Sequence, residues 1–195
     1  VDSATSIITT MADNYVKSLD NNGYGVALAK GDFYWGSNGV AANKGMVLIH
    51  AYILTKDEKY LNAALSIVDY ILGRNPLDKS YLTGYGVNPV MKPHHRPSQA
   101  DSIDAPVPGM IAGGPNASAT DCAKKYNNPV AVARSYYDNS CSYATNEVAI
   151  NWNAPFAYVI GSLQAIAATG KSYDIKTPVS AKYELTSIPA ARNRI

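Results

Sequence analysis

Residues 38–72 of the chain read NGVAANKGMVLIHAYILTKDEKYLNAALSIVDYIL, and this stretch decides the fold. Up to about Leu54 its apolar side chains fall on most faces, which predicts a helix that is buried all round. From about Lys56 to Leu72 they recur at three- and four-residue spacing, which predicts a second helix that ends at Gly73. Because about three residues separate the two segments, we expect an antiparallel helical hairpin.

Two further helices are expected around this hairpin. One covers residues 2–20, where apolar side chains again recur at three- and four-residue spacing. The last is expected over residues 153–169 with Pro155 near its first turn, and an earlier start would kink the helix at this proline. Ser37 or Asn38 is the expected N-cap of the helix that begins the hairpin.

The region 74–145 carries most of the proline and glycine and shows little periodicity. Connections of this length in a compact domain are usually functional. The tail 171–195 is weakly patterned and is expected to be a linker or a surface strap. Since no segment alternates like a strand, the sequence predicts an all-α protein of packed helical hairpins with long loops at one end.

Composition narrows the class of protein. A length of 195 residues with 47% hydrophobic and 16% charged residues predicts one globular domain. The net charge of +2 and the scattered Lys and Arg make nucleic acid a poor candidate partner. No apolar run approaches the roughly 18 residues needed to span a membrane, so no membrane partner is expected. The 15 Tyr against 2 Phe favour a wet, polar binding cleft, and the low charge favours a secreted, extracellular protein.

The two cysteines, Cys122 and Cys141, are separated by 18 residues of the loop-rich region. They predict either a disulfide, if the compartment is oxidising, or two buried thiols. No Cys-x-x-Cys spacing accompanies them, so a zinc site is not expected.

Residues 136–154 read YYDNSCSYATNEVAINWNA and set Asp138 and Glu147 nine positions apart. We expect the carboxyl group of Glu147 to lose hydration beside its apolar neighbours, which favours the neutral form of this group. These neighbours are Val148, Ile150 and Trp152. Aromatic rings in the same stretch provide flat apolar faces that suit sugars. The stretch therefore predicts a carbohydrate-cleaving acid or, with equal weight, an acid that caps the following helix.

Residues 80–96 read SYLTGYGVNPVMKPHHR and place imidazoles and a guanidinium on a turn framed by prolines. In an extended segment His94 and Arg96 lie on the same side, where both could donate hydrogen bonds to sugar hydroxyls or to a carboxylate. His95 is expected to be structural.

Together, these two segments resemble the signature segments of glycoside hydrolase family 9, a family of inverting cellulases. The similarity extends to residues 34–38 (YWGSN), 72–76 (LGRNP) and 113–116 (GGPN), and covers roughly residues 1–170. It implies that the helical hairpins belong to an (α/α)6 toroid.

The resemblance also implies roles for individual residues. In such enzymes the position of Glu147 holds the general acid that protonates the departing glycosidic oxygen, and Asp138 supports the catalytic site together with His94. The residues that contact the sugar chain or line the cleft are His94, Arg96, Trp35 and Tyr143.

One departure from the family pattern limits the match. An inverting enzyme needs a second carboxylate, which the family supplies from an Asp-Ala-Gly-Asp segment, and this sequence contains none. About four long helices are also too few for a six-hairpin toroid. We therefore expect residues 1–170 to be the C-terminal portion of a catalytic domain. Its partners would be a β-glucan such as cellulose and the N-terminal remainder. The alternative is a non-catalytic carbohydrate-binding fragment, and another helical-toroid carbohydrate enzyme is a weaker third interpretation.

The sequence also offers two minor sites. Asp101 and Asp104 provide oxygen ligands suited to a structural calcium ion, although a capped turn is the favoured explanation of this pair. Asn116 begins an Asn-x-Ser pattern, which is a glycosylation acceptor in secreted eukaryotic proteins. No cofactor is expected to be required for the chemistry.

Overall fold

A computed structural model describes residues 2–123 and 125–170 of the chain. Its four long helices are α1 (Asp2–Leu19), α2 (Ser37–Thr55), α3 (Glu58–Leu72) and α6 (Ile150–Ala167). The short helical elements are η1 (Lys30–Asp32), α4 (Arg96–Ala100), η2 (Val132–Arg134) and α5 (Tyr143–Asn146). The described residues form no strand, only isolated bridges, so the all-α class is confirmed. The predicted tail, 171–195, lies outside the described residues.

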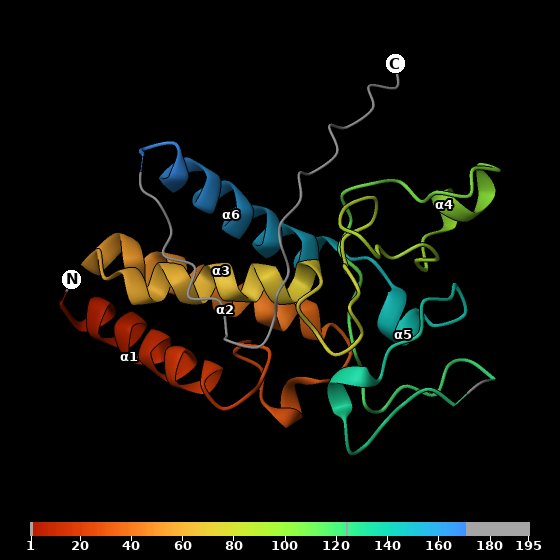
Figure 1. The fold of residues 1–195 in the computed structure, drawn as a ribbon, viewed down its shortest axis with the longest axis horizontal. Coiled ribbons are helices and arrows are strands. Elements are labelled where there is room, and N and C mark those ends of the chain that lie inside the picture. The colour runs from red at the N-terminus through yellow and green to blue at the C-terminus, as the bar shows by residue number, and fades with distance from the viewer. Residues whose placement is uncertain (1, 124, 171–195) are drawn as a thin grey trace.

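Helix α2 lies at the centre of the helical layer, between α1, α3 and α6 (Figure 1). Its hairpin with α3 has the predicted form, because only two residues separate the helices. Lys56 adopts a left-handed conformation with φ 60°, and the Asp57 carboxylate caps α3 by accepting a hydrogen bond from the Lys59 N–H at 3.0 Å.

The core forms where these helices meet. Its largest fully buried aliphatic side chains on the long helices come from α2, α3 and α6: Leu48, Ile49, Ile67, Ile71 and Val159. The prediction that α2 is buried all round is wrong, because Asn43 and His50 are exposed on one face and Ile53 and Leu54 in the last turn are nearly half exposed. Within the described part of the chain, no helix is both long and apolar enough to cross a bilayer.

The start of α2 differs from the prediction. The N-cap is Gly36, in a left-handed conformation with φ 92°, and neither predicted side chain caps the helix. Ser37 Oγ instead donates to the Pro115 carbonyl at 2.8 Å, and Asn38 Nδ2 donates to the Ala112 carbonyl at 2.9 Å. Both side chains are fully buried, so the polar residues at this end join the helix to a distant loop.

Helix α6 begins three residues earlier than predicted, at Ile150. The Ala149 carbonyl accepts hydrogen bonds from the N–H groups of Trp152 and Asn153, which closes the first helical turn before Pro155. The proline therefore lies inside the helix, in its second turn. The Asn153 side chain does not cap the helix, because its Oδ1 accepts from the Ile111 N–H at 2.9 Å.

The loops that follow α3 gather at one end of the long helices, beside α4 and α5 (Figure 1). Isolated bridges pair His94 with Glu147 and Ala112 with Val148. Three segments that are distant in sequence thus meet at the start of α6, and the predicted position of the loops is confirmed.

Candidate active site

Glu147 lies in the short connection between α5 and α6. Its N–H donates to the Tyr143 carbonyl at 3.2 Å, and its own carbonyl accepts from the Gly113 N–H at 2.9 Å. The half-buried side chain places Oε2 at 3.1 Å from Trp35 Nε1, which donates a hydrogen bond to it. The general-acid candidate is therefore fixed through both its backbone and its carboxyl group.

Aromatic rings flank this carboxyl group. Trp35 and Tyr143 have ring centroids 5.5 Å apart, and the His94 ring meets the Tyr143 ring edge-on at 6.0 Å. Trp35 is 46% and Tyr143 42% exposed, so large parts of both rings are accessible to a ligand. Flat, partly exposed rings beside a hydrogen-bonding group are typical of sugar-binding surfaces.

The surroundings of Glu147 differ from the prediction in two ways. Ile150 is 88% exposed and does not enclose the acid. The N-cap of α6 is Ala149, so Glu147 does not cap that helix either. The side chain of Trp152 is half-buried and faces Gly36, Gly39 and Gly113, where added Cβ atoms would lie 2.4 to 3.0 Å from its indole atoms. Trp152 therefore supports the site as a packing residue.

His94 is fixed by its surroundings in a defined tautomer. Its Nδ1 lies 2.6 Å from the Ser140 carbonyl, which can only accept, so this nitrogen carries the proton. The opposite nitrogen, Nε2, remains for a ligand. His95 is structural as predicted, because its side chain caps α4 by accepting from the Ser98 N–H. Arg96 is exposed in the first turn of α4.

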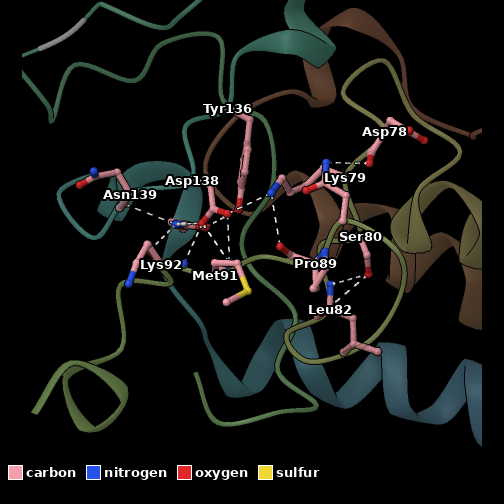
Figure 2. Close-up of polar contacts among 12 residues, drawn as sticks. Asp78, Lys79, Ser80, Leu82, Pro89, Met91, Lys92, Tyr136, Asp138 and Asn139 are labelled. Atoms are coloured by element: carbon pink, nitrogen blue, oxygen red, sulfur yellow. Dashed lines mark hydrogen bonds and ion pairs between the residues drawn. The ribbon is translucent and has the colours of Figure 1, made fainter. Parts of the chain in front are cut away.

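Asp138 is the centre of a polar network rather than an open acid (Figure 2). Lys79 Nζ donates to its Oδ2 at 3.0 Å, and the Met91 N–H does the same at 3.0 Å. The Lys92 N–H donates to Oδ1 at 2.9 Å, and Asn146 Nδ2 lies 3.2 Å from the same oxygen. Both oxygens are thus occupied by protein donors, which fits the supporting role that the resemblance implies.

The charge of Asp138 is stabilised in the folded state. Burial by itself would raise the pKa of this carboxyl group, but the Met91 and Lys92 N–H groups and the Lys79 ammonium outweigh it and hold the pKa below its ordinary value. Asn146 is fully buried and accepts a hydrogen bond from the Tyr136 hydroxyl. The network therefore joins the segment after α3 to the segment that leads into Glu147.

A disulfide joins Cys122 and Cys141, which is the first of the two predicted alternatives. Next to it, the Asp121 carboxylate accepts a hydrogen bond from the Ala144 N–H at 2.6 Å, in the first turn of α5. The Tyr126 hydroxyl donates to the same carboxylate. The bridged loop thereby holds the turn that carries Tyr143.

The two minor sites lie in different surroundings. Asp101 Oδ1 accepts from the Ile103 N–H at 3.0 Å, as in a capped turn, and Asp104 is fully exposed with Lys92 Nζ 3.8 Å away. Among residues 2–123 and 125–170 no group of three or more His, Cys, Asp or Glu side chains is placed to hold a metal ion. A calcium site at Asp101 and Asp104, which would also use backbone carbonyls, stays a prediction. Asn116 is 3% exposed and its Nδ2 donates to a backbone carbonyl, so a glycan cannot be attached there in the folded protein.

Several residues that build the site were not predicted from the sequence. Lys79, the ion-pair partner of Asp138, has no distinguishing local pattern. The same holds for Asp121, which holds α5. Gly39 could have been noticed, because glycine within an apolar helix often marks close approach of another group.

The helices and the site define a class of protein: an all-α domain with one carboxylic acid set among aromatic and histidine side chains. The sequence profile described as Glycosyl hydrolase family 9 matches residues 1–160. The chain belongs to this family, and the resemblance found in its two loop segments is confirmed.

Individual relatives agree with this assignment. A cellulose 1,4-beta-cellobiosidase of Acetivibrio thermocellus is 38% identical over an alignment of 178 residues that covers 85% of this chain and 20% of the relative. A xyloglucan-specific endo-beta-1,4-glucanase of Bacteroides ovatus is 43% identical over 137 residues, which is 70% of this chain and 23% of the relative. The chain thus spans about a fifth to a quarter of the length of these relatives.

Solved structures give the same result. A mutant thermostable endoglucanase from Alicyclobacillus acidocaldarius superposes with a TM-score of 0.77 at 37% identity, covering 83% of this chain and 31% of that one. A Bacteroides ovatus family 9 structure gives a TM-score of 0.75 at 36% identity, and the match covers 85% of this chain and 29% of that one. The described helices are therefore a portion of the family's helical toroid.

Proposed function

We propose that this chain is the acid-bearing C-terminal part of an enzyme that hydrolyses β-1,4-glucosidic bonds in cellulose or a related β-glucan with inversion. The observation that carries the proposal is the Glu147 carboxyl group, half-buried and bonded to Trp35, with the exposed faces of Trp35 and Tyr143 beside it. The names of the relatives, a cellobiosidase and a xyloglucan endoglucanase, support the β-glucan substrate class.

The proposed reaction has two halves. Glu147 gives its proton to the glycosidic oxygen as the bond from that oxygen to the anomeric carbon breaks, and water attacks the carbon from the opposite face. A carboxylate base takes the proton of this water. The sequence has no Asp-Ala-Gly-Asp segment, so the base comes from the N-terminal remainder of the enzyme, roughly 6.5–9.5 Å from the acid as in inverting glycosidases generally.

The other residues of the site hold the substrate and position the acid relative to it. His94 presents Nε2 to the sugar chain because its Nδ1 is held by Ser140. Arg96 is an exposed donor for sugar hydroxyls. Asp138 acts through the loops that it joins. The disulfide and the low charge favour an extracellular location for the whole enzyme.

Replacing Glu147 by Gln in the full-length enzyme tests the proposal. The amide cannot donate the required proton to the leaving group, so the rate on a β-glucan oligosaccharide should fall by about 10²-fold or more, while binding is retained. Glu58→Gln on the exposed start of α3 is the matched control and should keep full activity. Turnover at the wild-type rate by the Gln variant would remove Glu147 from the acid role. A wild-type protein that binds the glucan without cleaving it would favour the binding-fragment alternative.

A further inference from the structure

The indole N–H of Trp35 makes a contact that a sugar platform does not need. Trp35 precedes α2, yet its Nε1 lies 3.1 Å from Oε2 of Glu147, 112 positions further along the chain. Within residues 2–123 and 125–170 this is the one hydrogen bond to the Glu147 carboxyl group. The orientation of the proposed acid therefore depends on a single donor.

Trp35 is held by packing contacts of its ring and of the residue that follows it. Its ring packs on Tyr143 with centroids 5.5 Å apart. The next residue, Gly36, has φ 92° and lies against the Trp152 indole. A Cβ added at Gly36 would be 2.6 Å from Nε1 of Trp152. The backbone of Glu147 is fixed by bonds to Tyr143 and Gly113. The donor and the acceptor are thus both positioned by contacts other than the hydrogen bond between them, and this bond fixes the remaining side-chain rotation of Glu147.

This bond distinguishes the two carboxyl oxygens chemically. An indole N–H can only donate, so Oε2 of Glu147 must accept. In a protonated carboxyl group the carbonyl-type oxygen is the better acceptor, which leaves the proton on Oε1. After the proton has moved to the glycosidic oxygen, the same N–H stabilises the carboxylate that remains, because hydrogen bonds to charged acceptors are the stronger ones.

We propose that Trp35 is a positioning residue for the general acid: its indole N–H holds Oε2 of Glu147 so that Oε1 carries the proton delivered to the leaving group. This inference rests on the proposed function and deepens it. The indole face stays half exposed and free to stack on a sugar ring.

The test uses two substrates that differ in their need for the acid. In cellotetraose the leaving group is a sugar, which departs poorly and requires protonation. In dinitrophenyl β-cellobioside the leaving group is 2,4-dinitrophenolate, which departs without protonation. The Trp35→Phe variant of the full-length enzyme keeps a ring and loses the N–H. We expect the kcat of this variant to fall about ten- to hundredfold on cellotetraose, which is part of the ~10²–10⁴-fold that a general acid contributes. On dinitrophenyl β-cellobioside we expect its kcat to fall less than about threefold.

Two comparisons make the outcome unambiguous. Tyr143→Phe, which alters the neighbouring ring without touching the carboxyl group, should change both rates by the same factor. Glu147→Gln should show the same substrate dependence as Trp35→Phe, but larger. Equal losses on both substrates for Trp35→Phe would overturn the positioning role and leave a sugar platform only. If wild-type enzyme cleaves neither substrate, or if Glu147→Gln keeps the wild-type rate on cellotetraose, the proposed function itself fails.

Discussion

Replacing Asp138 by Ala should destabilise the protein strongly, because this carboxylate holds several donors at once. Its side chain is 18% exposed and that of Lys79 is 15% exposed. Without the carboxylate, Lys79 becomes a largely buried charge with no counter-ion, and the Met91 and Lys92 N–H groups lose their acceptor. Removing one partner of a buried ion pair typically costs about 3–5 kcal/mol. Because this pair keeps some exposure, we expect the free energy of unfolding to fall by about 3 kcal/mol, the lower end of that range.

Urea unfolding followed by circular dichroism measures this cost. With a slope of about 2 kcal/mol per molar urea, a loss of about 3 kcal/mol lowers the unfolding midpoint by about 1.5 M. The matched control is Asp104→Ala, which removes a fully exposed carboxylate 3.8 Å from Lys92 and should leave the midpoint unchanged. An Asp138→Ala midpoint equal to that of the wild type would refute the view that this network joins the loops.

The same network predicts how stability depends on pH. Because the folded-state pKa of Asp138 is lowered from 3.8, the stability that its charge provides is fully present above that value and is lost as the pH falls through the folded-state pKa. The gap between wild type and Asp138→Ala should therefore narrow below about pH 4. A gap that is constant from pH 6 to pH 2 would show that the charge does not contribute.

Two further predictions concern the supports of the site. Replacing Cys122 and Cys141 together by Ser should lower the free energy of unfolding by about 3 kcal/mol in the chain-entropy model, and an unchanged urea midpoint would contradict this. Gly39→Ala would place a Cβ 2.4 Å from the Trp152 indole, so overpacking should cost about 1–3 kcal/mol and lower the Tm by several degrees. Gly23→Ala, which meets no atom within 4 Å, is the control in the same thermal scan.

The sequence was informative wherever the signal is local. The spacing of apolar side chains over residues 38–72 predicts the α2–α3 hairpin almost to the residue, since helical periodicity depends only on neighbours three and four positions apart. The two loop segments were sufficient to recognise the family, because a signature fixes residue types in order without any coordinates. The predictions failed at element ends, as at Ser37 and the start of α6, where a cap competes with a tertiary partner.

What the sequence by itself determined is thus the helical class and the family, because both depend on the types and order of residues along the chain. Tertiary structure alone decided which donor meets which acceptor. Asp138 pairs with Lys79 across 59 positions and Glu147 with Trp35 across 112, and neither spacing carries a periodic signal. The physical reason is that a hydrogen bond forms only when atoms lie about 3 Å apart in a suitable direction, and the packing of loops against the helices sets those positions.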